Sequence, residues 1–179
     1  FVSEESHYSF NIASNVVGIG QSNLIKIRCN EHGQMRADSL EDEIKRALEI
    51  GQIPFAVLAT SGTTVRGSFD PLREVAEIAH KYDLWMHVDA AWGGSCLFST
   101  QYRSLIDGIE LADSFCWDAH KMMGIPPICS AFIVKDAEIL RAVCSNGNTA
   151  HYLYLETGED VDLGLYSLQC GRRNDALKL

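Results

Sequence analysis

The chain has 179 residues, of which 46% are hydrophobic, and this is enough for one globular domain with a sizeable core. Its 15 basic and 24 acidic side chains give a formal net charge of −9, which argues against a nucleic-acid partner. No apolar run reaches the roughly 18 residues of a membrane span, and no signal-peptide pattern opens the chain, so we predict a cytoplasmic protein without a membrane partner.

The first part of the chain changes from a helical to a strand pattern and back again. Apolar spacing predicts a helix within Glu5–Val17, and the alternation of apolar and basic residues predicts a half-exposed strand over Leu24–Cys29. The pair Asp38-Ser39 offers an N-cap for a second helix, and Gly51 is suited to end it in a left-handed conformation.

Two apolar runs in the middle of the chain have the length of buried strands. They cover Phe55–Ala59 and Leu84–Val88, and a loop over Thr60–Ser68 follows the first. Between them, Asp70 is predicted to cap a helix that has Pro71 at its first position. The order strand, helix, strand predicts an α/β fold with a mainly parallel central sheet flanked by helices.

The last part of the chain continues this pattern with shorter elements. Strands are predicted over Ser114–Trp117 and Cys129–Val134, a helix over Asp136–Val143, and a long polar loop over Ser145–Gly158. The chain opens without an initiator Met, and Asp175–Leu179 has the pattern of a helix that is interrupted. We therefore expect a fragment of a longer chain.

A carboxylate and a lysine follow two of the predicted strands. Asp89 comes directly after Leu84–Val88, and Lys121 follows Ser114–Trp117, at the strand ends where open α/β sheets hold their ligands. Taken alone, Asp89 could be a helix cap or a structural ion-pair partner, and Lys121 a solvated surface lysine. Together they are what pyridoxal phosphate requires, because the lysine forms an imine and the carboxylate keeps the pyridine nitrogen protonated.

Weaker signals accompany this pair. The loop Thr60–Thr64 supplies hydroxyl and N–H groups to the same edge, although such loops are common in ordinary turns. His7 has a flat ring that could stack on a ligand, although a lone histidine is more often solvated or structural. The cysteines show no CxxC spacing, and His80 and His87 have no ligand spacing, so we predict no metal site.

The motifs taken together resemble one family. They are SEESHYS, ATSGTTVRGSFDP, HVDAAWGG, WDAHKMMG followed by CSAFIV, and LQCGRRNDALKL. In collinear order they resemble the group II pyridoxal-phosphate-dependent amino-acid decarboxylases, most closely the glutamate and cysteine-sulfinate decarboxylase branch. The resemblance implies the fold type I large domain of pyridoxal-phosphate-dependent transferases. Residues 1–179 would be its central part, without the N-terminal phosphate loop and the C-terminal small domain, in a homodimeric full-length protein.

The resemblance assigns roles around the ring of pyridoxal 5'-phosphate. His7 would stack on one face of the ring, and Ala91 would pack against the other. Asp89 would hold the pyridinium nitrogen, and Thr64 would lie near the ring hydroxyl and the substrate carboxylate.

The resemblance also assigns residues to the bond-making steps. Lys121 would carry the Schiff base, His120 would contact the cofactor phosphate, and Tyr152 would return a proton to the α-carbon. The match at Tyr152 needs a two-residue insertion. The chain departs from the family at Asp118-Ala119, where the family has Asn-Pro, and an aspartate does not favour a nearby phosphate.

The substrate implied by the resemblance is a small amino acid, most closely an acidic one such as glutamate, aspartate or cysteine sulfinate. Decarboxylases of 2,4-diaminobutyrate share these motifs. Two alternatives remain, namely another fold type I lyase or aminotransferase, and a catalytically inactive structural relative.

Overall fold

The computed structural model describes residues 1–145, 163–169, 171 and 173–179. Its strands are β1 (Val2–Ser3), β2 (Lys26–Ile27), β3 (Ala56–Thr60), β4 (Trp85–Asp89), β5 (Ser114–Asp118) and β6 (Ser130–Val134). Its α-helices are α1 (Ser9–Val16), α2 (Ala37–Glu49), α3 (Leu72–Lys81) and α4 (Ala137–Cys144). Short 3₁₀ helices are η1 (Gln21–Asn23), η2 (Gly93–Phe98), η3 (Arg103–Ile106), η4 (Ile109–Leu111), η5 (Leu163–Tyr166) and η6 (Asp175–Lys178).

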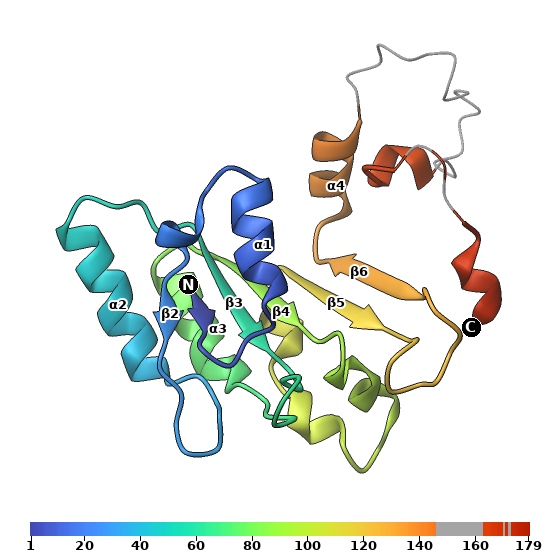
Figure 1. Cartoon of the computed structure of the whole chain (residues 1–179), viewed down its shortest axis with the longest axis horizontal. Helices are drawn as coiled ribbons and strands as arrows, with labels where there is room; N and C mark the ends of the chain where they lie inside the picture. The colour runs from blue at the N-terminus through green and yellow to red at the C-terminus, as the bar shows by residue number, and fades with distance from the viewer. Residues whose placement is uncertain (146–162, 170, 172) are drawn as a thin grey trace.

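The strands form one mixed sheet in the order β2-β1-β3-β4-β5-β6 (Figure 1). All neighbouring pairs are parallel except β5 and β6, which are antiparallel. The prediction of a mainly parallel sheet flanked by helices is therefore confirmed. In the described part of the chain, no helix is both long and apolar enough to cross a membrane.

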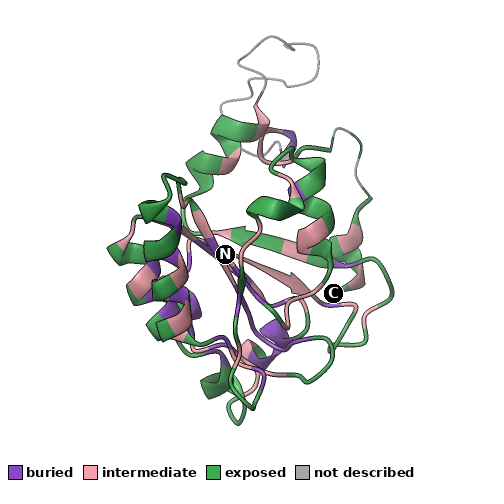
Figure 2. Cartoon of the chain, turned by 60° about the vertical axis from the view of Figure 1, so that its left-hand side comes forward, coloured by how far each residue is buried: buried purple, intermediate pink, exposed green. Residues whose placement is uncertain are grey.

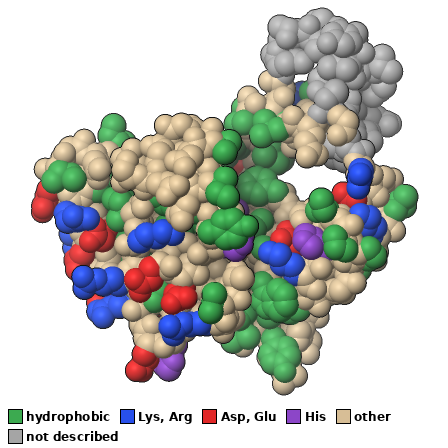
Figure 3. Space-filling model, in the orientation of Figure 1, with side chains coloured by type: hydrophobic (Ala, Val, Ile, Leu, Met, Phe, Trp, Pro, Cys, Tyr) green, Lys and Arg blue, Asp and Glu red, His purple; other side chains and the backbone are tan. Residues whose placement is uncertain are grey.

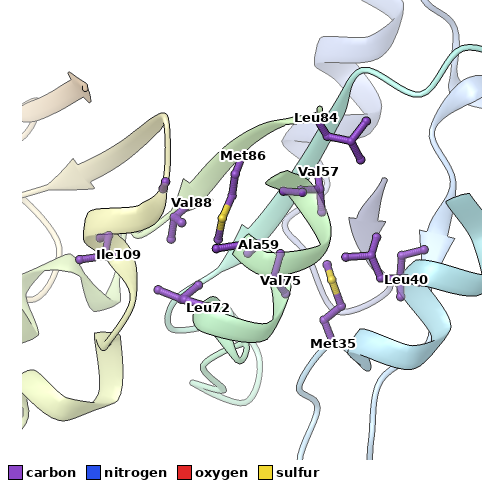
Figure 4. Close-up of a cluster of buried hydrophobic side chains, with 14 of the residues drawn as sticks. Met35, Leu40, Val57, Ala59, Leu72, Val75, Leu84, Met86, Val88 and Ile109 are labelled. Carbon is purple, nitrogen blue, oxygen red and sulfur yellow. The ribbon is translucent and has the colours of Figure 1, made fainter. Parts of the chain in front are cut away.

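The core lies on the face of the sheet that α2 and α3 cover (Figure 2, Figure 4). Because side chains alternate along a strand, Met86 and Val88 of β4 point into this core together with Val57 of β3. Leu40 belongs to the apolar stripe of α2 and Val75 to that of α3. Burial of each such side chain stabilises the folded state by about 1.5–3 kcal/mol. The opposite face of β4 carries Trp85, His87 and Asp89, and these side chains are left for other contacts.

Charged side chains of both signs lie on the side of the molecule where α2 is found, and apolar side chains gather along the middle of the same view (Figure 3). Several charged side chains form ion pairs on exposed helix surfaces, such as Arg46 with Glu43 and Lys81 with Glu41. Exposed pairs of this kind contribute little to stability, so the buried face of the sheet dominates the folding energy.

Two predicted caps are wrong. Asp70 does not cap α3, because its buried carboxylate instead accepts the main-chain N–H groups of Met35 and Thr60, each at 2.7 Å. Asp38 lies within the first turn of α2, where its side chain accepts from Arg36 and from the Ser39 N–H. By contrast, Asp136 does cap α4, since its carboxylate accepts the Glu138 N–H at 3.0 Å.

The remaining differences concern strand and helix lengths. β2 covers two of the six residues predicted for it, because its partner β1 is itself only two residues long. The helix predicted within Glu5–Val17 is α1, which begins at Ser9, whereas the interrupted helix expected at the end is the 3₁₀ turn η6. Gly51 has φ of +78° directly after the end of α2, as predicted. Most of the predicted loop over residues 145–158 lies outside the described residues.

Candidate active site

A cavity of about 320 Å³ lies at the carboxyl ends of β3, β4 and β5. It is lined by His7, Ser9, Phe10, Thr60, Gly62, Thr64, His87, Asp89, Ala91, Trp92, Cys116, Asp118 and Lys121. Five of the predicted site residues are therefore brought together, although they come from segments up to 114 residues apart in the sequence. They are His7, Thr64, Asp89, Ala91 and Lys121.

Asp89 is the last residue of β4, and its carboxylate is held on one side only. Oδ1 accepts the Ala91 N–H at 3.1 Å and the Cys116 thiol at 3.5 Å. No donor from the described residues lies within hydrogen-bonding distance of Oδ2. The carboxylate is thus fixed through one oxygen while the other remains available to the cavity.

The face of the sheet that carries Asp89 also carries a hydrogen-bonded group of Trp85, Ser114 and His87, called the polar ladder. The indole N–H of Trp85 donates to Oγ of Ser114 at 2.9 Å, and Nδ1 of His87 lies 2.9 Å from the same oxygen. The Ser114 hydroxyl is therefore the shared hydrogen-bond partner of the indole and the imidazole. Burial lowers the pKa of His87, opposed in part by Asp89, so the ring is neutral at pH 7.

Lys121 reaches the cavity from the turn after β5. Its Nζ lies 3.0 Å from Oδ2 of Asp118 in an ion pair that is partly buried on the aspartate side. The turn is held in place because the Lys121 N–H donates to the Asp118 carbonyl and the Asp118 N–H donates to the Ala91 carbonyl. Asp118, the residue that departs from the family pattern, is therefore the partner of the lysine.

The loop after β3 forms another wall. Gly62 has φ of +87°, and a Cβ there would lie 2.9 Å from the Gly93 nitrogen, so only glycine fits between this loop and η2. Thr60 lines the cavity, and its Oγ1 is buried without a hydrogen-bond partner among the described residues. Thr64 is exposed at the cavity rim. Asp70 stabilises the start of the loop through its bond to the Thr60 N–H.

His7 closes the cavity from the segment before α1. The Ser9 N–H donates to Nδ1 of His7 at 3.3 Å, and the Ser9 hydroxyl lies 2.9 Å from the same nitrogen. These contacts orient the imidazole, whose ring also packs at 4.3 Å from that of Tyr8. Phe10 adds an aromatic wall next to it.

Two predicted residues are not brought into this group. His120 does not line the cavity, because its Nδ1 lies 3.1 and 2.9 Å from the nitrogen and carbonyl oxygen of Cys129, across the hairpin to β6. Tyr152 lies outside the described residues. Within the described residues, no group of three or more His, Cys, Asp or Glu side chains is arranged to hold a metal ion.

Cys116, His87 and Phe10 line the cavity although no motif predicted them there. Strand alternation would have placed His87 on the same face as Asp89, two residues along β4. Cys116 required knowledge of the register, in which it stands opposite Asp89.

The residues present fit a pyridine ring that carries an aldehyde. The volume suits a small flat ligand, a carboxylate oxygen and a lysine share the cavity, and the Thr60 hydroxyl in its wall has no hydrogen-bond partner in the part of the chain that the structure describes. A carboxylate and a lysine at the carboxyl ends of neighbouring strands define the class of α/β proteins that bind pyridoxal phosphate.

The comparison with known families agrees with this class. The model of the pyridoxal-dependent decarboxylase conserved domain matches residues 1–179. The chain therefore belongs to the pyridoxal-dependent decarboxylase family, and the resemblance found in its motifs is confirmed.

Solved structures of this family are similar to the chain over most of its length. Apo mouse CSAD, a cysteine sulfinic acid decarboxylase, is 40% identical with a TM-score of 0.92, over 99% of this chain and 37% of that one. A second similar structure is the glutamate decarboxylase domain of a Vibrio parahaemolyticus diaminobutyrate-pyruvate transaminase and L-2,4-diaminobutyrate decarboxylase. It is 34% identical with a TM-score of 0.77, and the match covers 79% of this chain and 31% of that one. Oryza sativa TDC with PLP and tryptamine is 27% identical with a TM-score of 0.90, and the match covers 99% of this chain and 37% of that one. The chain thus spans about 37% of the length of mouse CSAD.

Proposed function

We propose that the chain forms the central part of the cofactor-binding domain of an enzyme that decarboxylates an acidic L-amino acid to its amine and CO2. The observation that carries the proposal is that Asp89 and Lys121 line one cavity at the carboxyl edge of the sheet. Membership of the decarboxylase family supports the reaction class.

When bound, pyridoxal phosphate supplies the electron sink that accepts the electron pair left by loss of CO2. Asp89 would keep a proton on the ring nitrogen through Oδ2, the oxygen that no described protein group occupies. Lys121 would hold the cofactor through its amine after leaving Asp118. His7 and Ala91 would hold the ring flat from its two faces, and Thr64 would orient the substrate carboxylate. On the family resemblance alone, we keep the proposals that His120 contacts the phosphate, although its ring bonds to Cys129 and does not line the cavity, and that Tyr152 returns a proton to the α-carbon.

The preference for an acidic substrate is supported by sequence identity. Over the aligned region, mouse CSAD is 40% identical to the chain, whereas the Oryza sativa TDC structure, which contains tryptamine, is 27% identical. We infer glutamate, aspartate or cysteine sulfinate as the substrate on this ground.

We also infer a homodimeric, cytoplasmic full-length protein. The homodimer is inferred from the family resemblance. Apolar side chains are also exposed beside the cavity, at Trp92, Met122 and Met123, and either a second subunit or the rest of the full-length chain would cover them. Sedimentation of the full-length protein at several concentrations tests this inference, and a monomer at all of them contradicts it.

The reaction is tested with the full-length protein, pyridoxal phosphate and a panel of glutamate, aspartate, cysteine sulfinate, 2,4-diaminobutyrate and tryptophan. We expect CO2 and the matching amine from an acidic member of the panel, and no product from Lys121→Ala. Amino transfer without CO2 release would instead identify an aminotransferase. Failure to bind the cofactor would indicate a structural relative.

A further inference from the structure

We propose that Cys116 is a positioning residue for Asp89, whose thiol hydrogen bond fixes the carboxylate so that Oδ2 is presented to the cofactor. The inference rests on the proposed function, because it concerns how Asp89 is prepared for the ring nitrogen. It assigns a role to a side chain that neither the motifs nor the family resemblance singled out.

The sheet register creates the contact. β4 and β5 are parallel, and Asp89 pairs with Cys116 in their ladder, so the two side chains stand next to each other on the cavity face. Sγ lies 3.5 Å from Oδ1, within the range of a thiol hydrogen bond. The Ala91 N–H approaches the same oxygen at 3.1 Å. Two donors thus hold Oδ1, and rotation of the carboxylate that would exchange the two oxygens breaks both bonds.

The surroundings keep the thiol in its donating form. Burial, followed by the negative charge of Asp89, raises the pKa of Cys116 to about 12. At neutral pH the sulfur therefore carries its hydrogen, and a thiolate, which would repel the carboxylate, does not form. A half-buried thiol that keeps its proton is a poor nucleophile and a poor metal ligand, so hydrogen bonding is the chemistry left to it.

The competing explanation is that Cys116 only fills space, as many buried cysteines do. Two substitutions separate the explanations, because Cys116→Ala removes the donor whereas Cys116→Ser keeps a hydroxyl in its place. Cys96→Ala is the control, since Cys96 is a buried free cysteine that does not line the cavity.

The first measurement is the dissociation constant of pyridoxal phosphate for the full-length protein, followed through the visible absorbance of the lysine-bound cofactor. Loss of one weak donor to a charged acceptor should raise the constant about three- to tenfold in Cys116→Ala. Cys116→Ser and Cys96→Ala should stay within about twofold of the wild type. Equal binding by Cys116→Ala and wild type, or equal losses in the Ala and Ser variants, would overturn the inference.

The second measurement needs no cofactor. In the cofactor-free protein, Asp89→Asn should accelerate alkylation of Cys116 by iodoacetamide at least about threefold, because the thiol ionises more easily without the carboxylate. Peptide mass spectrometry reports the rate at Cys116 alone, and an unchanged rate would overturn the inference. Failure of the wild-type protein to bind pyridoxal phosphate refutes the proposed function. Unchanged binding by Cys116→Ala in a protein that does bind it refutes the inference alone.

Discussion

Substitution of Asp70 by asparagine should change the pH dependence of stability in a defined direction. The carboxylate is buried and accepts two main-chain N–H groups, those of Met35 and Thr60. Burial raises the pKa of Asp70 from 3.8 to about 6, against the lowering effect of these two bonds. The folded protein therefore binds the proton more tightly than the unfolded chain. The stability that this provides is complete below pH 3.8 and is lost as the pH rises through about 6.

A pKa change of this size corresponds to about 3 kcal/mol. The asparagine side chain of the Asp70→Asn variant does not titrate, and its amide leaves one of the two buried N–H groups without an acceptor, at a cost of about 1–3 kcal/mol that does not depend on pH. The free energy of unfolding of the wild type minus that of Asp70→Asn should therefore be larger at about pH 4 than at about pH 7.5, by about 2.5 kcal/mol. Urea denaturation of both proteins across this range measures the difference, in which all other titrating groups cancel. A difference that stays constant with pH would refute the reasoning.

Three further substitutions test other parts of the site. Asp118→Asn removes the ion-pair partner of Lys121, and an amine without a carboxylate partner gives up its proton more easily to form the imine. Borohydride trapping of pyridoxal phosphate on the lysine should therefore become faster by at most about fivefold, and a slower rate would contradict this. Gly93→Ala places a Cβ 2.4 Å from the Ser61 carbonyl oxygen and should cost about 1–3 kcal/mol in urea denaturation, whereas Gly171→Ala, where a Cβ meets no described atom within 4 Å, should change stability little. Ser114→Ala leaves Trp85 and His87 without their shared partner and should cost about 1–3 kcal/mol, and an unchanged thermal transition would argue against the ladder.

The parts of the fold that were predictable from the sequence depend on local patterns. β3, β4 and β5 contain short apolar runs of strand length, and the ends of these runs determine where Asp89 and Lys121 lie. Burial on both faces is not found in β4, because only its core face is fully buried and Trp85, His87 and Asp89 on the other face are half-buried. The apolar stripes of α2 and α3 were equally visible, because both helices bury one face against the sheet.

The parts that were not predictable depend on contacts between distant segments. Asp70-Pro71 has the sequence of a helix cap, but the carboxylate bonds to Met35, which lies 35 residues earlier in the chain. The partner of Lys121 follows from the turn geometry of residues 118–121, and the partner of Cys116 follows from the strand register. β1 has only two residues, which is too short for any periodic signal.

The position of β1 has a consequence for the order of folding. This strand occupies an interior place in the sheet, where Val2 pairs with Lys26 on one side and Leu58 on the other. Its slot is complete only after a chain segment more than 50 residues later has reached the sheet, and such distant pairings form slowly. His7 follows this strand closely. We therefore expect His7 to reach its place in the cavity late in folding, after β3 and β4 have paired.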